Sequence, residues 1–448
     1  MAETPDLLEL CKAAIDAAEG DEAVEAYGAE SRHTEVRTRA REVEGLTFSE
    51  TRGIGIRVVS DGKLGYAYAA DPSVDEVRST VARARENVAF AMPDEFNVLP
   101  LPGSAEPMPD IFREEQASLE TDRKVSLALD LERVATTTDP RVTKTDDVLY
   151  GDAISRAVVV TSTGISQDAS RTDCWSYVSA LAEDGHETEN ASDFRLAREV
   201  GELDWADCGS TAAQRAARIL GAKKPPTGRF PVVLDPKASS DFLGVLAGAL
   251  SAEAVQKGRS LFAELVGEQI GAELFTLIDD GRLEIGPEAA PFDDEGVPTE
   301  RTPLIERGTL RGFLHNTYTA RRGNARSTGN AKRAGYSGVP GVGTSNFYVP
   351  AGDLDPSDLL ARAEGGVLVQ EVLGVHSGAS PISGEFSVGA TGLRVSGGEL
   401  GEPLREMTIA STIPDMLKAV AAVGSDLRFF SSVGTPTILI GEMTVAGV

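Results

Sequence analysis

Alternating hydrophobic and polar positions near the N-terminus predict a β-hairpin between two amphipathic helices. Residues 53–69 read GIGIRVVSDGKLGYAYA, in which a β-branched run and an aromatic alternating run flank an Asp-Gly pair typical of a two-residue hairpin turn. Apolar residues recur at helical spacing over residues 5–18 before the hairpin and over residues 71–91 after it. Asp71 or Ser73 is the expected N-cap of the second helix.

The same order of patterns recurs later in the chain. Residues 121–137 predict a helix, residues 155–185 predict strands, and residues 210–224 predict another helix. We interpret this as two passes of helix, hairpin and helix within one α+β domain.

A domain boundary is predicted at about Pro225. The preceding KKPPTG segment has linker chemistry, because consecutive prolines prevent helix continuation and keep the chain extended. A short buried strand, RFPVVLDP, and an apolar helix follow, and the rest is rich in glycine and short strands, ending in TPTILIGEMTVAG. The sequence therefore predicts an α+β fold of two domains, an N-terminal helix and β-hairpin domain over residues 1–224 and a β-rich domain over residues 225–448 that opens with a helix.

Composition and charge narrow the function classes. The chain of 448 residues carries 70 acidic and 43 basic residues, for a net charge of −27. Such a surface repels nucleic-acid phosphates and anionic lipid, so we expect neither a nucleic-acid nor a membrane role. The dispersed acidic residues suggest a halophile-like source. Three widely spaced cysteines and the lack of an apolar signal segment or spanning run predict a reduced, cytoplasmic protein.

One carboxylate stands out in the helix predicted over Gly244–Ser260. Read as one helix, Leu246 and Leu250 form an apolar face that Glu253 shares, with Lys257 one turn later. The two charges either balance each other structurally or belong to a chemical site, and the structural interpretation is favoured. Neither Ala252 nor Lys257, which flank this carboxylate, is a plausible zinc ligand.

The remaining candidates for chemistry are few. The four histidines, His33, His186, His315 and His376, show no metal-ligand spacing, and no Ser, Thr or Cys has a nucleophile motif such as G-x-S-x-G. His376 is the most suggestive, in a Gly/Ser-rich loop, although the sequence slightly favours a turn-stabilising role for it.

A basic stretch, NTYTARRGNARSTGNAKR, interrupts the acidic chain. It gathers five cations, Arg321, Arg322, Arg326, Lys332 and Arg333. These side chains either bind an acidic peptide, a C-terminal carboxylate or a partner face, or pair internally with the excess carboxylates. The sequence favours neither.

Taken together, several segments resemble the TldD/PmbA family. They are RGIGIRVVSDGKLGYAYAAD, LSAEAVQKGRSLFAELVGEQIG, TYTARRGNARSTGNAKR, TSNFYVPAGD, SGEFSVGATGLRVSGGELGEPLREMTIA and PTILIGEMTVAG, which span most of the chain in order. The resemblance implies a cytoplasmic zinc metallopeptidase of two subunits that acts on unfolded or precursor peptides. In it, the TldD subunit carries H-E-x-x-x-H and a distant Cys, and the PmbA (TldE) subunit lacks this metal motif.

Carried onto this chain, the two metal histidines fall on Ala252 and Lys257, while the water-activating glutamate is kept as Glu253. No cysteine follows Cys208. The resemblance therefore implies a vestigial site, no catalytic residue, no metal and no cofactor in this subunit, with zinc only in a TldD-like partner. Lys257 is expected to replace the metal in balancing Glu253, so that its loss costs more stability than an exposed pair.

Partners and contacts follow from the same resemblance. We expect a heterodimer with a TldD-like subunit or a homodimer, and contact with a peptide substrate. Residues expected to touch substrate or partner are Arg259, Ser327, Thr328, Gly329, Asn330, Lys332, Arg333, His376 and Ser377. Two alternatives stay open: a stand-alone homodimeric peptidase or hydrolase with an unrecognised site using Glu253 and His376, and a peptide-binding protein without catalysis.

Overall fold

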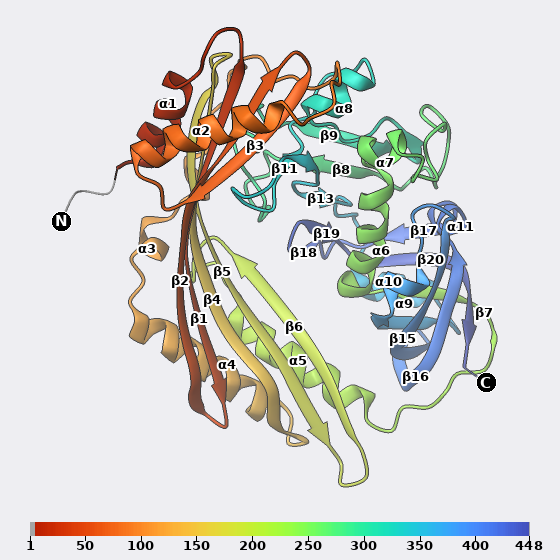
Figure 1. Ribbon diagram of the computed structural model, residues 1–448. Helices are drawn as coiled ribbons and strands as arrows, with labels where there is room; N and C mark the ends of the chain where they lie inside the picture. The colour runs from red at the N-terminus through yellow and green to blue at the C-terminus, as the bar shows by residue number, and fades with distance from the viewer. Residues whose placement is uncertain (1–4, 448) are drawn as a thin grey trace.

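The computed structural model describes residues 5–447, which fold into a long N-terminal sheet with helices and a β-rich C-terminal half (Figure 1). The two halves are called here the N-terminal half, residues 5–224, and the C-terminal half, residues 225–447. The elements of the N-terminal half are α1 (Leu7–Asp16), β1 (Ala23–Arg39), β2 (Glu42–Ser60), β3 (Lys63–Ala70), α2 (Val74–Val88), η1 (Pro109–Ile111), α3 (Glu114–Ala117), α4 (Thr121–Thr138), β4 (Val142–Thr161), β5 (Ser166–Glu183), β6 (Thr188–Ala197) and α5 (Trp205–Ile219).

The N-terminal half is one six-stranded antiparallel sheet built from two similar passes. Each pass runs helix, three strands, helix: α1, β1 to β3 and α2, then α4, β4 to β6 and α5. The strand order is β3-β2-β1-β4-β5-β6, so the first strands of the two passes pair with each other at the centre. The predicted repetition is therefore present, with a three-stranded meander in each pass where the sequence predicted a hairpin.

Local sequence signals produce the elements of the first pass as predicted. Asp61 and Gly62, both with positive φ (49° and 72°), form the turn between β2 and β3, as a type I′ turn requires. Ser73 caps α2 with a complete capping box, since its side chain accepts from the backbone N–H of Glu76 and the Glu76 carboxylate accepts from the backbone N–H of Ser73.

The helices of both passes cover one face of the sheet. Along β1, Val24 and Ala26 pack against α1 and α2, and Val36, of the same alternation, packs against α4. Tyr27 lies on the opposite face and packs with Phe292 of the C-terminal half. One face of the sheet is thus closed by its own helices, and one end of the other face forms the junction between the halves.

The C-terminal half is rich in short strands. Its elements are β7 (Gly228–Leu234), α6 (Pro236–Ala249), α7 (Ala252–Gln256), β8 (Leu277–Asp280), β9 (Arg301–Glu306), β10 (Thr309–Leu310), α8 (Thr317–Arg322), β11 (Ala331–Lys332), β12 (Gly341–Val342), β13 (Phe347–Tyr348), α9 (Pro356–Arg362), β14 (Val367–Leu373), α10 (Val375–Gly378), β15 (Glu385–Ser396), β16 (Glu399–Thr412), α11 (Ile413–Lys418), β17 (Val420–Val423), β18 (Arg428–Phe430), β19 (Val433–Thr435) and β20 (Ile438–Ala446). The α+β class with a β-rich C-terminal part is confirmed, and this part begins with β7 followed by α6.

Two sheets enclose the apolar helix α6. One has the order β10-β9-β8-β13-β19-β18, and the other has the order β16-β15-β14-β7-β20-β17 and closes on itself through an additional β16–β20 pairing. Buried side chains of α6, among them Phe242 and Leu246, share one core with both sheets, and α6 runs between them in Figure 1. This core holds α6 in place up to Leu250.

The prediction of one continuous helix over Gly244–Ser260 is wrong. Helix α6 ends at Ala249, Ser251 adopts an extended conformation, and a separate short helix, α7, follows. The backbone is diverted because Ala252 N–H donates to Leu314 O (2.9 Å) and Leu314 N–H donates to Leu250 O (3.0 Å). A parallel bridge to a distant segment thus replaces the next helical turn.

The helices are all too short or too polar to span a bilayer, as far as residues 5–447 are concerned.

Candidate functional site

The segment that the family resemblance assigns to the metal motif lies on α7, at the surface. Ala252 is buried, whereas the side chains of Glu253 and Lys257 are 39% and 54% exposed, and their charged groups are in contact. Glu253 was expected on the buried apolar face of the preceding helix. The break at Ser251 turns it toward solvent instead, so the pair is an ordinary i, i+4 surface pair.

The residues at this position do not fit a zinc ion. A tetrahedral site needs three or four nitrogen, sulfur or carboxylate donors, and here one expected ligand is alanine and the other is a lysine whose ammonium group faces Glu253. Within residues 5–447 no group of three or more His, Cys, Asp or Glu side chains is placed to hold a metal ion. We therefore derive no chemical step through a metal in this chain.

The end of α7 is built by local rules. Gly258 has φ 64°, and the backbone N–H of Arg259 donates to Ala254 O (2.8 Å), which closes the helix as in a Schellman motif. The Gln256 amide donates to Thr319 O (2.8 Å) and ties α7 to α8. Arg259 is exposed beyond this turn, and its function as a contact residue stays a prediction.

The first part of the predicted contact segment supports a neighbouring loop. Thr328 Oγ1 accepts from the backbone N–H of His315 (2.8 Å), and Ser327 Oγ donates to His315 O (3.2 Å). Gly329 has φ 69°, and a Cβ there would lie 2.5 Å from Pro298 O, so only glycine fits. Asn330 is fully enclosed and donates to the Asp279 carboxylate (2.7 Å). These side chains shape the loop, and most of their polar groups are already occupied.

The basic side chains of this stretch pair internally. Arg326 forms an ion pair with Glu300 (2.7 Å), and the Lys332 ammonium lies 3.5 Å from the Glu288 carboxylate. The Arg333 side chain is wholly buried against Glu25 of β1. Of the two interpretations left open by the sequence, internal pairing with carboxylates holds for these three cations.

Arg333 belongs to a buried ionic cluster that joins the two halves of the chain. Arg57 Nε donates to Glu25 (2.9 Å), and Arg57 Nη2 donates to Glu295 (2.9 Å) while also contacting Glu25. Side-chain exposure is at most 5% for these four residues, Glu25, Arg57, Glu295 and Arg333. We call them the junction cluster. Burial would raise the pKa of Glu25, but the charges of Arg57 and Arg333 outweigh it and lower that pKa.

Two glycines of the hairpin let the C-terminal half approach β2 closely. A Cβ at Gly53 would lie 2.5 Å from the Tyr336 ring, and one at Gly55 would lie 2.4 Å from Tyr336 O. Tyr66 Oη donates to Tyr336 O (2.6 Å) and to Gly338 O (3.1 Å) across the same junction. The GIGIR segment is therefore a docking surface for the 336–338 loop.

A pocket of about 520 Å³ opens beside the junction cluster, between the sheet and the C-terminal half. Its lining includes Tyr27, Arg171, Glu288, Lys332 and Tyr336. Burial would raise the pKa of Glu288, but Arg171 and Lys332 outweigh it and lower that pKa, so the carboxylate stays charged and paired. Paired charges of this kind can bind and orient a polar chain.

Of the predicted contact residues, only Lys332 and Arg333 line this pocket. His376 and Ser377 are exposed on α10, which begins after Gly374 (φ 74°). Their expected role in substrate contact remains a prediction. The structure also identifies residues that the sequence interpretation missed, Glu25, Arg171, Glu288 and Glu295. One sequence signal could have pointed to Glu25 and Glu295: Arg57 interrupts an apolar β-run, and a cation in such a run needs a buried carboxylate.

A helix-covered six-stranded sheet joined through a buried junction to a β-rich C-terminal half defines a protein of the α+β class. Residues 24–88, 114–220 and 227–447 match, respectively, PmbA/TldA metallopeptidase domain 1, the central domain and the C-terminal domain. The chain belongs to the PmbA/TldD metallopeptidase family.

Relatives support this assignment over nearly the full length. The chain is 28% identical to metalloprotease PmbA of Escherichia coli O157:H7, covering 92% of this chain and 89% of that protein. A Thermotoga maritima structure, described as a candidate modulator of a DNA gyrase, has a TM-score of 0.90 at 27% identity, covering 98% of this chain and 99% of that one. The fold is also that of TldE from Thermococcus kodakarensis, with a TM-score of 0.90 at 24% identity, covering 98% and 99%.

Proposed function

We propose that this chain is the non-catalytic, PmbA/TldE-like subunit of a two-subunit zinc metallopeptidase that acts on unfolded or precursor peptides in the cytoplasm. One observation carries the proposal. Lys257, at the end of α7, stands where the family resemblance places the second metal histidine. Its ammonium group forms an ion pair with the Glu253 carboxylate. Because alanine and lysine stand where the family's metal motif has its two histidines, Glu253 has no metal-bound water to activate.

In this proposal the subunit contributes assembly and enclosure, and zinc resides in a TldD-like partner. The junction cluster supports this role, because its buried pairs Arg57–Glu295 and Arg333–Glu25 join the two halves. A rigid pair of halves presents a constant surface to a partner subunit, and the pocket beside the cluster offers charged groups to a peptide.

The test compares this chain alone with the same chain co-purified with a TldD-like subunit carrying H-E-x-x-x-H. We expect an isolated chain without zinc or peptide cleavage, and a complex that cleaves an unfolded peptide and contains zinc equimolar with the partner. Zinc equimolar with the isolated chain, together with cleavage by it, would overturn the proposal in favour of a stand-alone peptidase.

A matched pair of substitutions locates the active subunit. Glu253→Gln in this chain should leave cleavage by the complex unchanged, whereas the same Glu-to-Gln change in the partner's H-E-x-x-x-H motif should abolish it. Loss of cleavage with Glu253→Gln, in a complex that still assembles, would show that Glu253 is catalytic and refute the proposal.

A further inference from the structure

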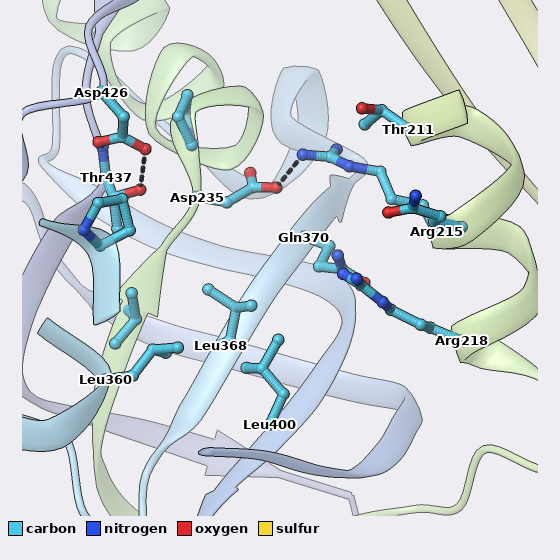
Figure 2. Close-up of a pocket in the computed structure, with 14 residues that line it drawn as sticks. Thr211, Arg215, Arg218, Asp235, Leu360, Leu368, Gln370, Leu400, Asp426 and Thr437 are labelled. Atoms are coloured by element: carbon cyan, nitrogen blue, oxygen red, sulfur yellow. Dashed lines mark hydrogen bonds and ion pairs between the residues drawn. The ribbon is translucent and has the colours of Figure 1, made fainter. Parts of the chain in front are cut away.

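A second pocket, of about 290 Å³, lies where α5 of the N-terminal half meets the C-terminal sheet (Figure 2). It opens on the face of that sheet opposite to α6: Val232 and Leu234 of β7 point to the α6 core, and Val233 between them lines the pocket. The pocket is separate from α7 and shares no lining residue with the pocket beside the junction cluster.

One wall of this pocket is aliphatic. Leu360 of α9, Leu368 of β14 and Leu400 of β16 line it together with Val233. Leu400 is 37% exposed although it is a leucine in a strand, and Leu368 is nearly buried. A branched aliphatic side chain of a ligand would bury this surface.

A buried amide without a partner faces the same space. Gln370 is only 7% exposed, and its Oε1 is shielded from solvent without a hydrogen-bond donor. Neither end of this carboxamide bonds to any residue of the described chain, 5–447, although buried polar groups are almost always paired. Gln370 lines the pocket but its Oε1 is covered by protein atoms, so a ligand N–H reaches this acceptor when the carboxamide rotates into the pocket.

A cation without a partner in the described chain, 5–447, lines the same pocket. Arg218 is exposed on α5, forms no ion pair or hydrogen bond within residues 5–447, and extends from α5 toward Gln370 in Figure 2. Its neighbour Arg215 is instead engaged by Asp235 (2.5 Å), a carboxylate that also caps α6 by accepting from Ala238 N–H.

The other carboxylate of the lining is occupied as well. Asp426 accepts from the backbone N–H (2.9 Å) and the hydroxyl (2.7 Å) of Thr437. The charge of Arg218 thus remains available to a ligand, and a guanidinium group binds a carboxylate through two parallel hydrogen bonds.

We propose that this pocket binds the C-terminal residue of a peptide that ends in a large aliphatic side chain. The terminal carboxylate pairs with Arg218, the Gln370 carboxamide rotates so that its Oε1 accepts from the N–H of the last residue, and the side chain packs against the three leucines. The volume is at the small end of ligand pockets, which suits one terminal residue. The inference rests on the proposed function for the choice of a peptide and deepens it by naming the end of the chain that is held.

The experiment titrates N-acetyl-Ala-Leu into the full-length chain without a partner, by calorimetry. Three comparison ligands separate the features: the C-terminal amide lacks the carboxylate, 4-methylpentanoate lacks the N–H together with the acetyl-alanyl group, and free leucine carries an ammonium group in place of the acetyl-alanyl amide. Loss of the carboxylate or of the N–H should weaken binding by about tenfold or more.

Two variants assign the contacts. Arg218 is exposed, so the Arg218→Ala variant should keep its fold. This variant should bind N-acetyl-Ala-Leu about tenfold more weakly, and should bind the peptide acid and the peptide amide with equal affinity. Gln370→Leu should remove the preference for N-acetyl-Ala-Leu over 4-methylpentanoate. Arg362→Ala is the matched control, since it removes an exposed arginine of α9 that does not line the pocket.

Several results would overturn the proposal: no binding at millimolar peptide, equal binding of acid and amide to the unmodified chain, or unchanged binding by Arg218→Ala. Tighter binding of free leucine would show an amino-acid site and refute the peptide end. The complex with a TldD-like subunit is measured separately. If the chain does not bind the peptide but still assembles with the TldD-like subunit, the proposed pocket site is refuted and the proposed function is not.

Discussion

Replacing Arg57 by methionine is the most direct test of the junction cluster. Methionine keeps an unbranched side chain but removes the guanidinium group that lies between Glu25 and Glu295. Glu25 retains Arg333, and Glu295 retains the backbone N–H of Thr317 (2.9 Å) but loses the cation paired with it. The substitution thus leaves an uncompensated carboxylate, about 1% exposed, inside the junction.

The expected cost follows from this geometry. Removing one partner of a buried ion pair costs about 3–5 kcal/mol, because the remaining charge is left desolvated. We expect the lower end, about 3 kcal/mol, since both glutamates keep one hydrogen-bond donor. Arg32→Met is the control in the same sheet: its pair with Glu50 has side chains 74% and 77% exposed at 3.7 Å, and should contribute less than about 0.5 kcal/mol.

Urea unfolding followed by tryptophan fluorescence measures the effect. Both tryptophans of the chain, Trp175 and Trp205, lie in the N-terminal half, so the signal reports the sheet that carries Arg57. The junction charges lower the folded-state pKa of Glu25, so its contribution to stability is present above its unfolded pKa and is lost as pH falls through the folded value. The difference between the unmodified chain and Arg57→Met should therefore shrink in acid.

Two results would refute the reasoning. One is a loss for Arg57→Met at neutral pH no larger than that for Arg32→Met. The other is a difference in unfolding free energy that stays constant as the pH falls. Either would show that the cluster carries little net energy and that packing alone holds the halves together.

Three further predictions concern α7, the hairpin and a buried carboxyl. Lys257→Ala should cost only about 0.2–0.5 kcal/mol in urea unfolding, as for an exposed helical pair, and a larger loss would restore the buried-charge interpretation. Gly55→Ala should cost about 1–3 kcal/mol because its Cβ meets Tyr336 O, whereas Gly45→Ala, with no atom within 4 Å, should be nearly neutral by the same assay. Burial raises the pKa of Asp279 from 3.8 to about 6. The protonated carboxyl therefore contributes to folding stability at low pH, and this contribution is lost as the pH rises through about 6. NMR titration should show this, and Asp279→Asn should flatten the pH dependence of the urea midpoint.

The sequence predicted elements well where the signal is local. The turn at Asp61 and Gly62, the cap at Ser73 and the helix that became α4 depend on residues a few positions apart, and each was confirmed within a residue or two. The helix predicted over residues 210–224 exists as α5 but begins and ends five residues earlier: its buried face already includes Cys208, and the chain leaves the helix before Gly221, which has φ 74°.

The candidate site was only partly predictable. The motif comparison located α7 and the segment ending at Arg333, but not what surrounds them. Arg333 meets Glu25, 308 residues earlier in the chain, and no local pattern encodes that distance. Gln370 and Arg218 showed no sequence signal at all, because what marks them is the lack of a partner in the folded chain.

By itself, then, the sequence determined the periodic elements, the α+β class, the acidic character and the presence of non-ligand side chains at Ala252 and Lys257, since these depend on residue type and near neighbours. The tertiary structure decided the break after Leu250, which a backbone bridge to Leu314 imposes, and the joining of both passes into one sheet through β1 and β4. It also decided which charges are buried. Long-range backbone pairing and desolvation act between segments that meet only after folding, and for that reason they set the register, burial and partners of the site.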